Sequence, residues 1–194
     1  MKRSAGEVRI IGGRLRGRRI AVPDAPGLRP TPDRVRETLF NWVGPKMAGA
    51  RVLDLFAGTG ALGLEALSRG AAAVTLVEQQ RVAVTALQET VQRLGVPEVR
   101  VVATDALSFL ASDQGQYDLI LLDPPFAADL LAPAVQAIVR HQRLAPDGVV
   151  YMEQPRDAGP PALPEGWNLH RSGRAGEVGY YLLHGASRDL SGHV

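Results

Sequence analysis

The chain of 194 residues contains no cysteine. Disulfide bonds, thiolate zinc sites and cysteine nucleophiles are therefore excluded, and a reducing cytoplasm suits such a chain. Aromatic residues are scarce, at 5% of the sequence, and no apolar run approaches the roughly 20 residues of a membrane span. The N-terminal stretch MKRSAGEVRIIGG also lacks the apolar core of a secretory signal. The sequence thus predicts a soluble, cytoplasmic protein that is not exported.

Metal-ligand spacing is missing as well, so no metal is expected. The four histidines carry no pattern that would bring ligands together, and surface or packing roles are expected for His141, His170, His184 and His193. There is no internal repeat, low-complexity tract or obvious partner-binding helix, and the expected state is a monomer.

Acidic residues are rare at the start of the chain. Residues 1–36 hold ten lysines and arginines against three acids, a net charge of +7, whereas residues 37–194 carry −5. Within this basic head, RIIGGRLRGRRIAV (9–22) predicts a β-hairpin with a positively charged tip. Two interpretations stay open: a solvated basic arm, or binding of RNA phosphates by Arg9, Arg14, Arg16, Arg18 and Arg19.

The rest of the chain alternates predicted strands and helices. After a proline-rich linker, TPDRVRETLFNWV predicts a helix that is capped by Thr31 and has one apolar face. Strands are then expected near 51–56, 73–78, 98–103, 117–122 and 148–153, helices near 61–69, 80–94, 105–112 and 129–141, and a final hairpin near 167–173 and 178–184. The pattern predicts a doubly wound, Rossmann-like α/β fold whose mostly parallel, seven-stranded sheet ends in an antiparallel hairpin.

The same pattern suggests three regions. Residues 1–45 would form a basic hairpin and capping helix that bind RNA, residues 46–185 the catalytic domain, and residues 186–194 a disordered tail.

Acidic residues mark the expected strand tips, where ligands of such sheets bind. The first strand ends LDLFAGTG, with Asp54 inside it and Gly58, Thr59 and Gly60 between strand and helix. Glycines there let a ligand approach the backbone and the N–H groups of the helix. The next three strands end at Glu78, at Asp105 with Ala106, and at Asp123.

A dinucleotide site is one interpretation, because Gly58, Gly60 and Gly63 spell GxGxxG and Glu78 follows at a suitable distance. The acids argue against an anionic pyrophosphate and favour a ligand with positive charge. S-adenosylmethionine offers a ribose diol to Glu78, an adenine amine to Asp105 and a cationic methionine end to the region of Asp54.

The fourth strand ends LILLDPPF. This motif suits transfer of the sulfonium methyl group of S-adenosylmethionine to an exocyclic amine of a nucleic-acid base. Asp123 and the carbonyl of Pro124 can accept the two amine hydrogens and so turn the nitrogen lone pair toward the donor. Pro124 and Pro125 restrict the backbone around these acceptors, and Phe126 can stack on the base.

These motifs resemble those of class I S-adenosylmethionine-dependent amino-methyltransferases. More narrowly, RIIGGRLRGRRI, GLRPTPDRVRETLFNWV and EVGYYLLH resemble the bacterial RsmD family, over about residues 8–184. The resemblance implies methylation of a guanine N2 in 16S ribosomal RNA, free or within the 30S subunit. It also implies that Asp105 with Ala106 meets the adenine, and that Arg29, Thr31 and Arg34 belong to a segment that lies over the cofactor.

Other functions fit the same pattern in part. A DNA or RNA adenine-N6 methyltransferase would use the same strand tips. A non-catalytic nucleic-acid-binding protein would be expected to lose the Asp-Pro-Pro-Phe motif, which is intact here. An NAD-dependent oxidoreductase agrees least well with the acids.

Overall fold

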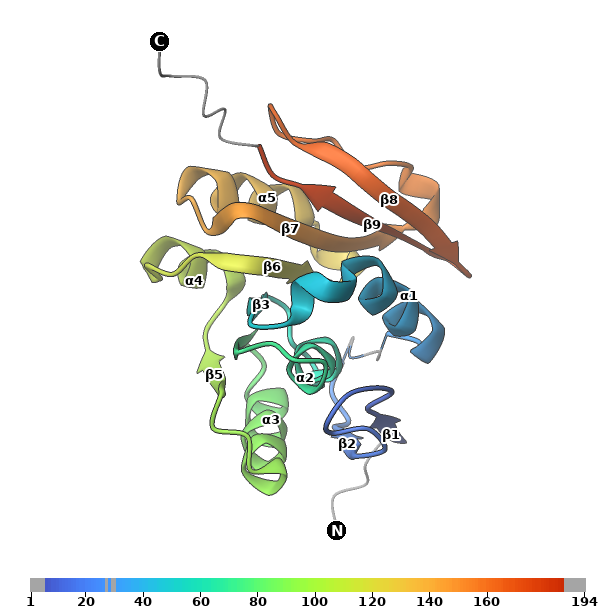
Figure 1. Ribbon diagram of the computed structural model, residues 1–194, viewed down its shortest axis with the longest axis vertical. Helices are drawn as coiled ribbons and strands as arrows, with labels where there is room; N and C mark the ends of the chain where they lie inside the picture. The colour runs from blue at the N-terminus through green and yellow to red at the C-terminus, as the bar shows by residue number, and fades with distance from the viewer. Residues whose placement is uncertain (1–5, 27, 29–30, 187–194) are drawn as a thin grey trace.

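The computed structural model describes residues 6–26, 28 and 31–186. Within these ranges the chain forms a seven-stranded sheet flanked by helices and a separate two-stranded sheet (Figure 1). Arg29 lies outside the described residues, as does all of the predicted tail except Ala186.

The central sheet has the strand order β5-β4-β3-β6-β7-β9-β8. Its strands are β3 (Arg51–Asp54), β4 (Ala73–Glu78), β5 (Val99–Ala103), β6 (Tyr117–Leu122), β7 (Leu144–Pro155), β8 (Asn168–Ala175) and β9 (Val178–His184). Strands β3 to β7 run parallel, whereas β9 is antiparallel to both β7 and β8. The chain winds outward from β3 to β5 and then returns to the other side of β3 with β6, which creates a switch point. The predicted fold is confirmed.

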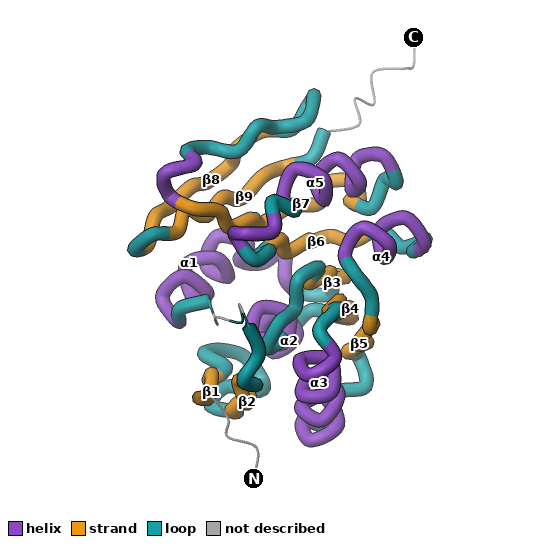
Figure 2. Tube along the Cα trace, turned by 180° about the vertical axis from the view of Figure 1, so that it is seen from behind, coloured by secondary structure: helices purple, strands orange, loops and turns teal. Residues whose placement is uncertain are grey.

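Helices cover both faces of this sheet (Figures 1 and 2). The helices are α1 (Asp33–Val43), α2 (Ala61–Ser68), α3 (Arg81–Leu94), α4 (Ala106–Ser112) and α5 (Leu131–Arg140), with short 3-10 turns η1 (Gly44–Met47), η2 (Phe126–Ala128) and η3 (Arg156–Ala158). One core cluster joins α1, α2 and α3 to one face, and a second joins α4 and α5 to the other. With both faces covered, the middle strands are apolar throughout, and Leu119 to Leu122 of β6 are at most 1% exposed.

The basic N-terminal segment forms the predicted hairpin, β1 (Gly6–Arg9) paired with β2 (Arg19–Val22). Its apolar side chains belong to the core cluster on the α1–α3 face: Val8, Ile10, Leu15, Ile20 and Val22. The loop between the strands is hydrogen-bonded to Ser68 at the end of α2. The N–H of Arg14 donates to the Ser68 carbonyl (2.8 Å), and the N–H of Leu15 donates to the Ser68 Oγ (2.9 Å). The hairpin is therefore built into the molecule and is not a loose arm.

A buried ion pair fastens the same hairpin to α1. The Arg36 side chain is fully buried, donates to the carbonyls of Arg9 (3.1 Å) and Thr31 (3.2 Å), and lies 3.4 Å from Glu65 on α2. Glu65 in turn accepts the backbone N–H groups of Ile11 and Gly12, both at 2.8 Å. Because each buried charge has partners, the desolvation cost of the pair is offset.

Two predicted boundaries were wrong. Strand β7 begins at Leu144 and not near 148, because Leu144 pairs with Tyr117 before a bulge that takes up Pro146, Asp147 and Gly148. Proline and glycine in this stretch resemble a turn in the sequence. At α1, the N-cap is Pro32 and has no side-chain cap, so Thr31 is not the cap that was predicted.

No helix among the described residues is long and apolar enough to cross a membrane.

Candidate active site at the carboxyl ends of the strands

The parallel strands β3 to β7 bring their carboxyl ends to one edge of the sheet, where most of the predicted site residues lie. The loop after β3 carries Gly58 and Gly60 with φ of 54° and 80°, in the left-handed region that favours glycine. The N–H of Gly60 donates to the carbonyl of Ala57 (2.7 Å), and the Thr59 hydroxyl accepts the N–H of Ala61 (3.3 Å). This tight turn leads directly into α2.

Glu78, at the end of β4, fixes the same turn. Its Oε2 accepts the N–H of Gly58 (3.0 Å), and its Oε1 accepts the N–H of Gln80 (2.7 Å). A carboxylate has about four acceptor positions, so two remain for a ribose diol. The position of Glu78 fits the predicted ribose contact.

Asp54, at the end of β3, is 1% exposed. Its Oδ2 accepts the N–H of Gly63 (3.0 Å), whereas Oδ1 is buried with no hydrogen-bond partner among the described residues. Burial raises the pKa of Asp54 to about 7, and the charges of Asp123 and Glu78 add to the shift. An unpaired buried carboxylate oxygen suits a ligand that brings a positive charge and N–H donors, such as the methionine end of the predicted cofactor.

Asp105 has a local structural role. It caps α4 by accepting the N–H of Ser108 (2.9 Å), and the bonds to Ser108 hold the pKa of this exposed carboxyl below its usual range. The neighbouring Ala106 is buried at 7% exposure. The predicted contact of this pair with adenine stays a prediction.

Asp123 follows β6 and is half-buried. Thr31 Oγ1 donates to Asp123 Oδ2 across 3.1 Å. Burial raises the pKa of Asp123 to about 6, and the Thr31 bond opposes part of that shift. The carboxyl is thus still ionised at neutral pH and can accept hydrogen bonds.

Solvent exposure increases abruptly along the segment Pro124-Pro125-Phe126. Pro124 is buried, Pro125 is exposed, and Phe126 is 45% exposed at the start of η2. A large aromatic side chain on so exposed a residue is available to stack on a base. The stacking role of Phe126 stays a prediction.

The segment before α1 reaches this edge only in part. Thr31 is buried against Asp123, which explains why its side chain does not cap the helix. Arg34 is exposed on the first turn of α1, and no hydrogen bond joins it to the other candidate residues among those described.

Sequence reasoning missed Tyr151 and Glu153, which lie on β7 beside Asp123. Glu153 is 4% exposed, and the Tyr151 hydroxyl donates to its Oε1 across 2.8 Å. Burial and, second to it, the charge of Asp123 raise the pKa of Glu153 to about 8. The signal was present, since VVYME ends a predicted strand on an acid just as the earlier strands do.

The five arginines predicted to bind RNA are all exposed on the hairpin. Two of them form surface ion pairs, Arg14 with Glu98 (2.7 Å) and Arg19 with Glu7 (2.8 Å). Exposed pairs of this kind are weak, about 1 kcal/mol or less, so phosphate could replace the carboxylates. A hollow of about 310 Å³ between the hairpin and α1 is lined in part by Arg9 and Arg16.

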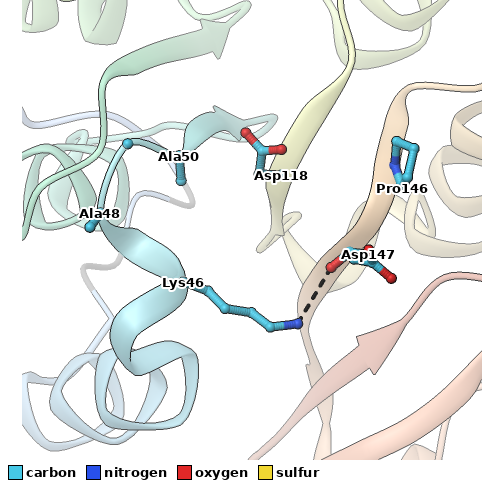
Figure 3. A pocket seen from close by; sticks show the side chains of 7 residues that line it. Lys46, Ala48, Ala50, Asp118, Pro146 and Asp147 are labelled. Atoms are coloured by element: carbon cyan, nitrogen blue, oxygen red, sulfur yellow. Dashed lines mark hydrogen bonds between the residues drawn. The ribbon is translucent and has the colours of Figure 1, made fainter.

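A shallow cavity of about 340 Å³ lies at the other edge of the sheet, where β3, β6 and β7 begin (Figure 3). Lys46 reaches across it to the carbonyl of Asp147 (3.4 Å), and Asp118 lies in its wall. None of the predicted site residues lines it. The strand-tip site, with its glycine turn and buried acids, is therefore the candidate active site.

The strand order and this site define a class I methyltransferase. The family model described as Conserved hypothetical protein 95 matches residues 8–184. Ribosomal RNA small subunit methyltransferase D of Escherichia coli (strain K12) is 47% identical over 178 residues, which span 92% of this chain and 90% of that protein. The protein of the same name from Haemophilus influenzae is 41% identical over 181 residues, which span 91% of this chain and 93% of that protein. The chain belongs to the ribosomal RNA small subunit methyltransferase D (RsmD) family.

A solved structure agrees with this assignment. Escherichia coli yhhF, described provisionally as a methyltransferase, matches with a TM-score of 0.87 and 42% identity, over 94% of this chain and 100% of that one.

Proposed function

We propose that this protein methylates the exocyclic N2 of a guanine in 16S ribosomal RNA, with S-adenosylmethionine as donor and S-adenosylhomocysteine as the second product. Relatives that are 47% and 41% identical over nearly their whole lengths are named ribosomal RNA small subunit methyltransferases. The observation that carries the amine chemistry is the half-buried Asp123, whose carboxyl accepts a hydrogen bond from Thr31 and is followed by two prolines and an exposed phenylalanine.

When bound, the donor supplies an electrophilic methyl group on a sulfonium, whose carbon–sulfur bond breaks as the nitrogen–carbon bond forms. The chain's own part is to hold the amine. Asp123 and the carbonyl of Pro124 accept its two hydrogens, so that the lone pair points at the methyl carbon. The ionised Asp123 also stabilises the positive charge that grows on nitrogen, and it takes the surplus proton and releases it to water.

The rest of the site would hold the donor. Asp54 faces the methionine end with its unpaired oxygen, Gly58 to Gly60 provide a close backbone approach, and Glu78 accepts the ribose hydroxyls. Asp105 and Ala106 would meet the adenine. Phe126 would stack on the target guanine after it has left its helix or loop.

The basic hairpin would bind the RNA. In this assignment residues 1–45 form the RNA-binding extension and residues 46–185 the methyltransferase domain, although the hairpin shares its core with the latter. The protein would act in the cytoplasm as a monomer, on 16S ribosomal RNA that is either free or within an assembling or assembled 30S subunit.

The test is transfer of labelled methyl from S-adenosylmethionine to unmodified small-subunit RNA, offered both naked and assembled with ribosomal proteins, followed by nucleoside analysis. N2-methylguanosine is the expected product. N6-methyladenosine would keep the amine chemistry and reject guanine as the target, and label found only on DNA would reject the RNA substrate.

A further inference from the structure

Glu153 is a buried acid at the active edge that the Asp-Pro-Pro-Phe motif does not include. Leu122 of β6 and Met152 of β7 are partners in the parallel register, so Asp123 and Glu153 come next on adjacent strands. Glu153 is also opposite Tyr180 of β9. Only 4% of the residue is exposed, which makes an unpaired charge there costly.

The two neighbouring hydroxyl groups do not have enough protons for every contact around Glu153 and Asp123, so one more proton is needed. Tyr151 donates its only hydroxyl proton to Glu153 (2.8 Å), and Thr31 donates its only one to Asp123 (3.1 Å). Thr31 also lies close enough to Glu153 to lower the pKa of that acid, so its hydroxyl is near both carboxyls. If both carboxyls were ionised, they would compete for the single Thr31 proton. If Glu153 is protonated, it can donate to Thr31 while Thr31 donates to Asp123, and every contact is satisfied.

Electrostatics place that proton on the same residue. Burial raises the pKa of Glu153 to about 8 and that of Asp123 to about 6. Among the described residues, the groups that act on Glu153 are Asp123 after β6, Tyr151 from its own strand and Thr31 from the segment before α1, with Tyr180 opposite on β9. Where two carboxyls share a poorly solvated site, the charge of one raises the pKa of the other, which favours one shared proton at neutral pH.

We propose that Glu153 is a positioning residue that stays protonated and, through Thr31, keeps Asp123 ionised and correctly oriented for the target amine. This rests on the proposed function of Asp123 as the amine acceptor. The Glu153 proton takes no part in the transfer: the surplus proton of the methylated nitrogen passes to Asp123 and then to water, while Glu153 remains a neutral acid.

Protonation can be measured without any RNA. The infrared difference spectrum between the wild type and Glu153→Gln at pH 7 should contain the C=O stretch of a protonated carboxylic acid, which disappears as pH rises above about 8. Subtraction removes the other acids, including Asp54. Glu177→Gln, at the exposed turn between β8 and β9, is the matched control and should give no such band. A wild type without the Glu153 band at pH 7 would overturn the proposal.

Methyl transfer tests the positioning role. Glutamine reproduces the neutral acid, since its amide can donate to Thr31 and accept from Tyr151. Glu153→Gln should therefore retain at least ten-fold more kcat than Glu153→Ala at pH 7, with the donor Kd similar in both. The kcat of the wild type should fall above pH 8, and that of Glu153→Gln should not. Titration of the RNA itself would affect both proteins alike.

The outcomes separate the two claims. If the wild type methylates RNA but Glu153→Gln is as inactive as Glu153→Ala, the positioning role is wrong and the proposed function stands. If the wild type binds the donor but methylates no RNA, the proposed function fails, and the infrared band alone decides whether Glu153 holds the proton.

Discussion

Asp54, Asp123 and Glu153 occupy the same edge of the sheet, and burial raises the pKa of each, to about 7, 6 and 8. An acid whose pKa is higher in the folded than in the unfolded state stabilises the fold below the unfolded pKa. That contribution is lost as pH rises through the folded pKa. Between pH 4 and 8 the three acids therefore reduce stability progressively. The arrangement serves ligand binding and chemistry at the expense of the fold.

Asp54→Asn should move stability and donor affinity in opposite directions. The amide keeps an oxygen for the N–H of Gly63 and removes the buried charge, so at pH 8 the Tm should rise by about 2 °C or more. The donor should bind at least ten-fold more weakly, because its positive end loses the carboxylate. Thermal unfolding at pH 5 and 8, with calorimetric titration of S-adenosylmethionine, measures both. Unchanged donor affinity would show that Asp54 does not bind the donor.

Thr31→Val should move the acid limb of the kcat/KM pH profile to higher pH. In the wild type, kcat/KM should rise with pH as Asp123 ionises near pH 6 and then level off. Because the Thr31 bond holds the pKa of Asp123 down, its loss should displace this rise to higher pH. Thr38→Val on α1 is the control, since the Thr38 hydroxyl only donates to the carbonyl of Arg34. Identical acid limbs in all three proteins would contradict the role of Thr31.

The sequence was sufficient to find Asp54, Glu78 and Asp123, because strand tips in a doubly wound sheet face one edge whatever the side chains do. It could not give the partner of Thr31. A threonine before Pro-Asp is typical of a helix cap, and only the tertiary fold, which brings Asp123 beside Thr31, directs its hydroxyl elsewhere. Glu153 was missed because it ends the fifth strand, beyond the tips that were considered.

At the scale of elements, the basic hairpin is locked to α2 by backbone as well as side-chain contacts. A Cβ on Gly13 would lie 1.8 Å from the carbonyl oxygen of Ser68, and Gly13 has a φ of 76°. Gly17 has a similar φ of 83°, but a Cβ there would meet nothing within 4 Å. The two glycines therefore separate backbone strain from the loss of docking.

Gly13→Ala should be more destabilising than Gly17→Ala by at least about 1 kcal/mol. Both variants carry the strain of a side chain at positive φ, but only the first must push the loop away from α2. Urea unfolding of the two variants and the wild type gives the difference. Equal losses would mean that the loop is not docked on Ser68.

Most elements could be predicted from the sequence, since the alternation of apolar strands and amphipathic helices fixes their order and approximate bounds. The docking of the hairpin could not. Its alternating apolar residues suggested a strand pair, but neither Glu65 nor Ser68 stands out in the sequence as its anchor. Both lie on α2, more than 50 residues away.

At the scale of the whole molecule, charge is separated between the basic head and the acidic remainder. Removing the hairpin would expose the core that Ile10 and Ile20 fill, so a deletion would confuse RNA binding with folding. Substitution of exposed arginines avoids this problem.

Replacing Arg16 and Arg18 together by glutamine should weaken RNA binding and reduce its salt dependence. Each lost phosphate contact removes about 0.7 to 0.9 from the slope of log K against log salt, so the double variant should lose roughly 1.5. The control is Lys46→Gln with Arg51→Gln, which removes the same charge outside the hairpin, near the start of β3. Filter binding to small-subunit RNA between 50 and 200 mM salt, chosen for the roughly linear range, compares them. Equal slopes in both double variants would contradict an RNA-binding hairpin.

The central claim is that Asp123 holds the amine that is methylated, and Asp123→Ala tests it most directly. Methyl transfer to small-subunit RNA and donor Kd are measured on the same preparations, because Asp123 is placed against the target base and not against the donor. The account predicts that transfer falls by at least about 100-fold, the scale of one lost transition-state contact, while the donor Kd changes less than about three-fold. Near-normal transfer by Asp123→Ala would contradict the account.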